Sequence, residues 1–288
     1  MSTTMKVSDF FSRLAATLKS CVKIAVQSRP VSKIPSCCKG GDRLVVLGNG
    51  PSLRKTIEEC GSKLREMPTM AVNFMANAPE FAAIRPDYYV LADPHFFHGI
   101  ENDNVALLWK NLANVDWPMT LCVPARMRKT ARRFLSQNGS GTTNVPDIAT
   151  FNFVGIEGFG WFERLAYRWR LGMPRPRNVL IPSIMTAINA GFKEILIAGA
   201  DHSWLETIRV TDDNHVVSVQ PHFYTDSKKE LVRSEKEYQG YHLHDILYSF
   251  YTAFRSYHII QAYAQSRDVK ILNITPGSYI DAFPRSTI

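Results

Sequence analysis

Short apolar runs alternate with longer amphipathic stretches along most of the chain. Six runs are apolar enough to be buried strands: residues 44–47, 70–73, 88–92, 120–123, 194–198 and 269–274. Helical patterns between them cover residues 51–65, 183–190 and 245–265. Strands that alternate with helices predict an α/β fold, with a doubly wound, mostly parallel Rossmann-like sheet.

Apolar residues near the N-terminus recur at helical spacing, which predicts an amphipathic helix over residues 7–27. The apolar positions are Phe10, Phe11, Leu14, Leu18, Cys21, Val22 and Ala25. Arg13, Lys19 and Lys23 make the helix basic, and such a helix can lie on an anionic membrane surface. Packing on the domain and binding to a protein partner are the alternatives. The Pro-, Ser- and Gly-containing stretch 29–41 predicts a linker, so residues 1–42 precede a folded domain of residues 43–288.

A polar stretch interrupts the strand and helix pattern at residues 203–240. It is rich in Asp, Lys, Glu and His, and we expect a lid over the carboxyl ends of the strands, because long loops in compact domains are often functional. The Gly-, Ser- and Thr-rich tract 138–144 predicts a flexible loop.

The net charge of the chain indicates which classes of partner it could bind. The 288 residues carry a formal net charge of +8, which favours an anionic partner such as a nucleotide, an acidic sugar or a lipid surface. We expect no nucleic-acid partner, because aromatic and basic residues do not interleave in a recognisable binding motif. The five cysteines lack the spacing of a disulfide framework or a zinc site. Without a membrane-spanning run or a clear signal peptide, the expected location is cytoplasmic, or peripheral on the inner membrane face.

A glycine-rich loop follows the first predicted strand. Its residues are Gly48, Asn49, Gly50, Pro51 and Ser52. Glycine permits a sharp turn and a close approach to a ligand, proline suits a first helical turn, and serine caps it. The N–H groups at the start of the following helix would then attract a phosphate. The loop matches neither the dinucleotide pattern nor a P-loop, so it predicts phosphate binding without specifying the nucleotide. A structural strand-to-helix turn is the alternative.

Polar residues also end other predicted strands. Asn73 ends the second strand, Asp93 ends the third, and Asp201 follows the fifth. Because parallel strands present their carboxyl ends at one edge of a sheet, we expect these residues to converge with the Gly48 loop. Asn73 would hydrogen-bond a base, ribose or phosphate, and Asp93 would bind a sugar hydroxyl or act as a base. A metal site that includes Asp93 and Asp201 is a weaker interpretation, and so is a set of capped turns.

Two histidines flank the start of the last long predicted helix, at His242 and His244. Histidine is the usual general base near neutral pH, so one of the two would deprotonate an attacking hydroxyl. The alternative is a helix cap. A basic helix face with Arg126 and Arg132, and Arg177 in a Pro-Arg-Pro-Arg stretch, offer further contacts to phosphate or to an acidic acceptor.

The order of these segments resembles a known family. The Gly48–Ser52 loop, Asn73, the strand ending before Pro94, the Gly191–Asp201 segment and the late histidine together look like the bacterial sialyltransferases of glycosyltransferase family 42 and the related DUF115 (MptE-like) proteins. The resemblance covers residues 43–288 in islands. It implies a GT-A-like variant of the Rossmann-like fold and an inverting, metal-independent and cofactor-free transfer of sialic acid from CMP-sialic acid.

The resemblance also assigns roles to residues. It implies that Gly48, Asn49, Gly50, Pro51, Ser52, Asn73, Ser183, Asp201, Thr275, Pro276 and Gly277 bind the donor nucleotide, that Asp93 contacts the donor sugar, and that His242 or His244 is the base. The family places tyrosines shortly after the aspartate that corresponds to Asp201, but this chain has Ser203 and Trp204 there. Tyr224, Tyr238 and Arg177 are the candidates to stabilise the departing phosphate instead.

Three functions therefore compete. The first is a glycosyltransferase that transfers an acidic sugar from a CMP-activated donor to a cell-surface glycan or glycolipid, as in lipopolysaccharide or capsule biosynthesis. The second is an MptE-like diphosphokinase that uses ATP and a divalent metal. The third is a non-catalytic nucleotide-binding protein. Neither the acceptor nor the oligomeric state follows from the sequence.

Overall fold

The computed structural model describes residues 7–37, 39–98, 103–139, 145–218 and 240–288. The strands are β1 (Arg43–Leu47), β2 (Thr69–Val72), β3 (Tyr88–Val90), β4 (Thr120–Pro124), β5 (Asp147–Phe151), β6 (Glu194–Ala198), β7 (Arg209–Val210), β8 (Val216–Val217) and β9 (Lys270–Asn273). The α-helices are α1 (Val7–Gln27), α2 (Ser52–Glu66), α3 (Glu80–Ile84), α4 (Asp103–Ala113), α5 (Arg128–Asn138), α6 (Gly160–Arg168), α7 (Leu180–Ala190) and α9 (Leu243–Gln265). Short 3₁₀ turns are η1 (Asn73–Asn77), η2 (Pro94–Phe97), η3 (Ala125–Met127) and η4 (Ser203–Thr207).

Seven strands form one sheet in the order β5-β4-β3-β2-β1-β6-β9, and all neighbouring strands are parallel. This confirms the predicted α/β fold with a parallel sheet, and all six predicted strands are present. The prediction missed β5, which pairs with β4 at the edge of the sheet. Its outer end is polar and Asp147 is exposed, so the apolar run is too short to recognise.

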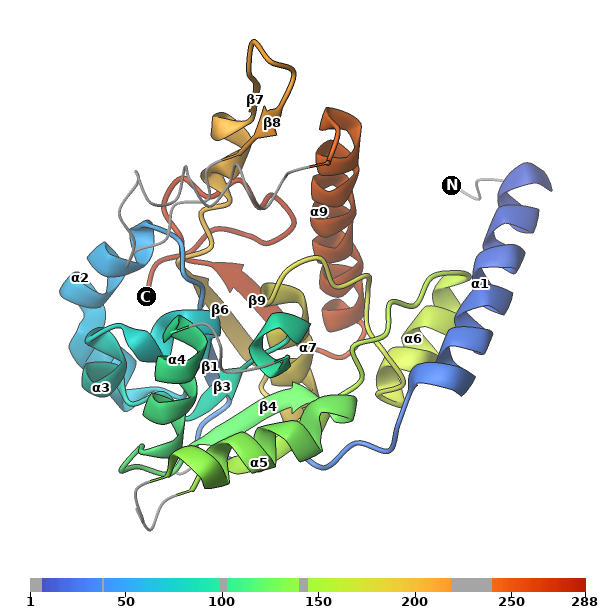
Figure 1. Cartoon of the computed structure of the whole chain (residues 1–288). Coiled ribbons are helices and arrows are strands. Elements are labelled where there is room, and N and C mark those ends of the chain that lie inside the picture. The colour runs from blue at the N-terminus through green and yellow to red at the C-terminus, as the bar shows by residue number, and fades with distance from the viewer. Residues whose placement is uncertain (1–6, 38, 99–102, 140–144, 219–239) are drawn as a thin grey trace.

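Helices cover both faces of the sheet, which makes three layers (Figure 1). Successive strand residues point to opposite faces, so Tyr88 packs into one core with α7 and α9, and Tyr89 packs into the other with α4 and α5. Both tyrosines are at most 1% exposed. Burial on both faces explains why these strands appear as continuous apolar runs instead of alternating patterns.

The segment between α1 and β1, predicted to be a linker, is bound to the domain along its length. The Ser28 hydroxyl donates to Leu171 O at 2.5 Å, and Tyr88 donates to Pro35 O at 2.7 Å. Ile34 is buried in the core, and Lys39 pairs with Asp87 at 3.0 Å. This segment therefore belongs to the folded unit and is not a free spacer.

The predicted lid is described only in part. Residues 203–218 form η4 and the antiparallel β7–β8 hairpin, which projects from the top of the view in Figure 1. Val216 of the hairpin packs with Ile246 and Phe250 of α9. The first turns of α9 therefore lie against the chain that leaves β6. Residues 219–239, the rest of the predicted lid, lie outside the described residues.

Candidate functional site at the β1–β6 switch point

The direction of the chain across the sheet reverses between β1 and β6. From β1 the strands proceed outward through β2, β3 and β4 to β5, and the chain then returns to place β6 on the other side of β1. In open α/β sheets, ligands bind outside the carboxyl ends of the strands at such a switch point. The loop that begins at Gly48 and the loop that begins at Gly199 meet at this position.

The two loops pack directly against each other. Gly48 N donates to Ala198 O, and Gly50 N donates to Gly199 O, both at 2.8 Å. A Cβ on Gly48 would lie 2.5 Å from Gly199 O. Contact between the loops is therefore enough to require Gly48, without the close approach of a ligand that the glycine-rich sequence predicts.

The side chain of Asp201, which follows β6, lies at the N-terminus of α2. Its Oδ1 accepts from Ser52 N at 3.2 Å, and its Oδ2 accepts from the Ser52 hydroxyl at 2.8 Å. Burial raises the pKa of the Asp201 carboxyl, and the two hydrogen bonds from Ser52 oppose that rise. The predicted capping role of Ser52 is wrong: Pro51 is the residue before the helix, and Ser52 is the first helical residue. A carboxylate of the chain itself thus lies where the sequence predicted a phosphate.

Two asparagines border the same edge. The Asn49 side chain is buried, and its amide donates to Val72 O at 3.1 Å. Asn73 has a positive φ of 51° and follows β2 directly. Its carbonyl oxygen accepts from the Tyr89 hydroxyl. Within the described part of the chain, the buried Asn73 Oδ1 has no hydrogen-bond partner. Buried polar atoms are almost always paired, so an unpaired oxygen at this edge of the sheet is an exception.

Other predicted site residues have structural roles at the same edge or lie elsewhere. Asp93 is exposed and accepts from His95 N at 2.8 Å. Thr275 is buried and braces the β6 loop, since its hydroxyl accepts from Ala200 N at 3.0 Å. Ser183 is fully buried in α7 and donates to Val179 O at 2.7 Å. Exposed positions are Pro276, Gly277 and Arg177, while Tyr224 and Tyr238 lie outside the described residues.

The two candidate bases differ in their surroundings. The His242 side chain accepts from the backbone N–H of Asp245, while the Asp245 carboxylate accepts from His242 N, so His242 caps α9. His244 is 81% exposed, and its Nε2 lies 3.5 Å from Asp245 Oδ1. Therefore one ring nitrogen of His242 is occupied by the helix, whereas the His244 ring faces solvent beside a carboxylate.

A buried histidine, His202, directly follows Asp201. It has a left-handed backbone conformation, with φ of 54°, and its Nε2 lies 2.7 Å from the Tyr257 hydroxyl. Tyr257 in turn is hydrogen-bonded to Asn178. Burial lowers the pKa of His202 to about 3. His202 is therefore neutral and links the β6 loop to α9.

The lowered pKa of His202 makes folding stability depend on pH. Below the ordinary pKa of 6.5, the unfolded chain binds a proton that the folded chain does not. Stability should therefore fall as the pH decreases from 6.5 toward 3, by up to about 1.4 kcal/mol per pH unit. Urea unfolding between pH 7 and 5 measures this slope. His202→Gln should flatten it, whereas His98→Gln, at an exposed position, should not. Equal slopes in all three proteins would refute the assignment.

A small pocket of about 130 Å³ lies farther along the same edge, where β3, β4 and β5 end. Pro94, Arg126 and Asn152 line it, together with Gln27 from the end of α1. Pockets for small-molecule ligands usually enclose roughly 300 Å³ or more, so this one accommodates only part of a ligand. Across the described ranges, no three His, Cys, Asp or Glu side chains cluster in a way that could hold a metal ion.

Comparison with known proteins found no family model and no curated protein that matches the chain. A solved structure, the MAf glycosyltransferase from Magnetospirillum magneticum AMB-1, matches with 12% sequence identity and a TM-score of 0.46. The match covers 98% of this chain and 39% of that chain. The present chain thus spans less than half of the length of that glycosyltransferase.

Proposed function

We propose that this protein is a glycosyltransferase that binds a nucleotide-sugar at the switch point between β1 and β6. The observation that carries the proposal is the buried Asn73 Oδ1, which has no partner among the described residues. It lies at the carboxyl edge of the sheet, at the end of β2 and beside β1, the strand that leads to Ser52, whose hydroxyl donates to Asp201. An amide oxygen in this state accepts a hydrogen bond from a ligand hydroxyl or amino group, and a nucleotide offers both.

The start of α2 carries positive charge as well as the Asp201 carboxylate. Helix N-termini favour acidic side chains, but the first turn of α2 contains none and instead carries Arg54 and Lys55. Asp201 already accepts from Ser52, so a phosphate would be repelled at that point. We therefore assign a ribose or sugar hydroxyl to the Asp201 side and the phosphate to the cationic side of the loop.

The donor in this proposal is a CMP-activated acidic sugar of the sialic acid type, and the acceptor is a glycan or glycolipid hydroxyl. His244 is the general base, since His242 is engaged in capping α9. Asp245, 3.5 Å from His244 Nε2, would orient the ring and stabilise the imidazolium. The acceptor oxygen bonds to the anomeric carbon as the bond to the CMP phosphate breaks, and the acceptor proton passes to His244. One displacement of this kind inverts the anomeric centre.

The proximity of α9 to the β6 loop supports this assignment. Trp204, three residues after Asp201, packs on Phe250 of α9 with ring centroids 3.9 Å apart. His202 reaches Tyr257 on the same helix. The segment after β6 thus contacts α9 within two turns of His244, at the end of the sheet where the donor would bind.

The proposal is tested by mixing the protein with CMP-sialic acid and a glycan acceptor and measuring CMP release and product. We expect transfer that persists in EDTA. Transfer of diphosphate from ATP, abolished by EDTA, would instead identify the MptE-like alternative. Nucleotide binding without transfer to any acceptor would favour a non-catalytic protein.

A further inference from the structure

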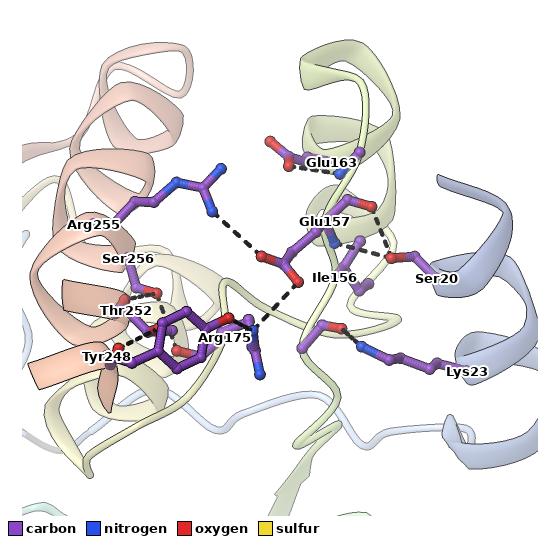
Figure 2. Close-up of polar contacts among 12 residues, drawn as sticks. Ser20, Lys23, Ile156, Glu157, Glu163, Arg175, Tyr248, Thr252, Arg255 and Ser256 are labelled. Carbon is purple, nitrogen blue, oxygen red and sulfur yellow. Dashed lines mark hydrogen bonds and ion pairs between the residues drawn. The ribbon is translucent and has the colours of Figure 1, made fainter. Parts of the chain in front are cut away.

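Helix α1 is attached to the domain by its polar side. Its buried residues are Thr17 and Ser20. The Ser20 hydroxyl donates to Glu157 O at 2.7 Å and accepts from Glu157 N at 2.9 Å, and the Thr17 hydroxyl accepts from Phe159 N at 3.1 Å. Lys23 donates to Gly155 O at 3.2 Å (Figure 2). Ile24 packs against the core and Phe10 contacts Phe159, but most apolar side chains of α1 stay exposed, whereas an amphipathic helix normally buries its apolar face.

The segment that contacts α1, residues 155–159, is itself attached to the rest of the domain by ion pairs of Glu157. The Glu157 carboxylate lies 3.8 Å from Arg175 and 3.3 Å from Arg255 of α9 (Figure 2). A Cβ on Gly158 would lie 2.1 Å from the Thr17 hydroxyl and 2.9 Å from Thr17 Cα. The backbone of α1 therefore approaches Gly158 closely, and at the other end of the helix Arg126 donates to Val26 O at 2.7 Å.

The apolar face of α1 consequently points away from the domain. Its side chains are 59–73% exposed at Val7, Phe11, Leu18, Val22 and Val26. Helix α6, which lies beside α1 in Figure 1, adds Leu165 at 37%, and Trp161 and the following Trp169 are 60% and 63% exposed. We call these eight residues the apolar face. So many exposed apolar side chains on two neighbouring helices are unusual for a domain in water and indicate an interaction site.

Positive charge accompanies the apolar face. The two helices contain Arg13, Lys19, Arg164 and Arg168, against Asp9 and Glu163, while Lys23 is directed toward Gly155 O. The Glu163 carboxylate turns inward to accept from Gly158 N at 3.0 Å, and burial raises its pKa. In the described ranges, neither Arg164 nor Arg168 forms an ion pair. Two copies of this face brought together would set like charges against each other, whereas an anionic surface would neutralise them.

We propose that the α1–α6 face binds the surface of an anionic lipid bilayer. At about 1.5 Å per residue, the 21-residue α1 provides a strip about 30 Å long. Phe11, Leu18 and Val22 enter the boundary between headgroups and acyl chains, and Trp161 and Trp169 are of the type that concentrates at that boundary. Arg164 and Arg168 contact lipid phosphates. The inference is independent of the proposed function.

Vesicle flotation tests this inference with the full chain. The protein should float with vesicles of phosphatidylcholine and phosphatidylglycerol, and much less with phosphatidylcholine alone. Leu18→Ser/Val22→Ser should weaken binding by about tenfold or more, because two exposed apolar side chains no longer insert. The matched control is Leu107→Ser/Val210→Ser, which removes an exposed leucine and an exposed valine elsewhere and should leave binding unchanged.

A second pair of variants tests how much the positive charges of α6 contribute to vesicle binding. Arg164→Gln/Arg168→Gln should lower binding to the anionic vesicles and reduce its salt dependence, while Arg128→Gln/Arg132→Gln on α5 should have little effect. The inference is overturned if the protein does not float with anionic vesicles, or if Leu18→Ser/Val22→Ser floats as wild type. Loss of a dimer in Leu18→Ser/Val22→Ser, without vesicle binding by wild type, would show that a second copy covers the face.

Discussion

Gly48→Ala should lower the free energy of unfolding by about 3 kcal/mol, because the added methyl group has no space. The nearest atom would be Gly199 O at 2.5 Å, followed by Gly199 C and Ala198 O. All are backbone atoms of the neighbouring loop, so no side chain can rotate away. Relief requires β1 and β6 to separate where Gly48 N donates to Ala198 O. Urea unfolding followed by circular dichroism measures the loss.

Gly61→Ala is the matched control for Gly48→Ala. Gly61 lies inside α2, and a Cβ there meets no atom within 4 Å. Alanine favours a helix over glycine, so this change should raise stability by roughly 0.5–1 kcal/mol. If Gly48→Ala were as stable as wild type in the absence of ligand, loop packing would not explain the glycine, and close approach by a ligand would.

His244→Ala should reduce the rate of sugar transfer by about 10²–10⁴-fold, the usual contribution of a general base. Binding of CMP should be unaffected, because His244 acts on the acceptor hydroxyl. The protein should fold normally, since the side chain is 81% exposed. Initial rates of CMP release and a parallel CMP titration separate the two effects.

His242→Ala distinguishes catalysis from capping. Because His242 accepts from the start of α9, its loss should cost about 1 kcal/mol of stability, with transfer rates near those of wild type. The assignment of the base is wrong if His242→Ala abolishes transfer and His244→Ala does not. Retained transfer in both variants would exclude a histidine base at this helix.

The sequence predicted the sheet well because buried parallel strands are continuous apolar runs that end at Gly, Asn or Asp. Leu44–Leu47 and Glu194–Ala198 are of this kind. The strand β5 escaped prediction because only its inner end is buried. The meeting of Ser52 and Asp201 also followed from topology, since both leave neighbouring parallel strands. Which atoms pair there did not follow, because 149 residues separate them and local propensity says nothing of that distance.

The direction in which α1 faces is the second feature that could not be predicted from the sequence. Helical periodicity predicted the extent of α1, and the bounds agree with the structure. Periodicity identifies an apolar face but not the direction in which it points. That direction depends on hydroxyls, Thr17 and Ser20, that meet the segment at Glu157 across 137 or more residues. Similarly, His202 is buried by packing against Trp204 and Tyr257, and these distant contacts do not follow from the sequence around it.

The central claim is that a nucleotide binds beside Asn73, and isothermal titration with CMP tests it most directly. Wild type should bind CMP in preference to ATP. Asn73→Gly should weaken CMP binding by about tenfold, the value of one hydrogen bond, since glycine retains the positive φ of 51° but removes the amide. Asn214→Gly, at a similar φ of 63° in the hairpin, should bind as wild type does. No binding of CMP, preference for ATP, or equal CMP affinity in Asn73→Gly would contradict the account.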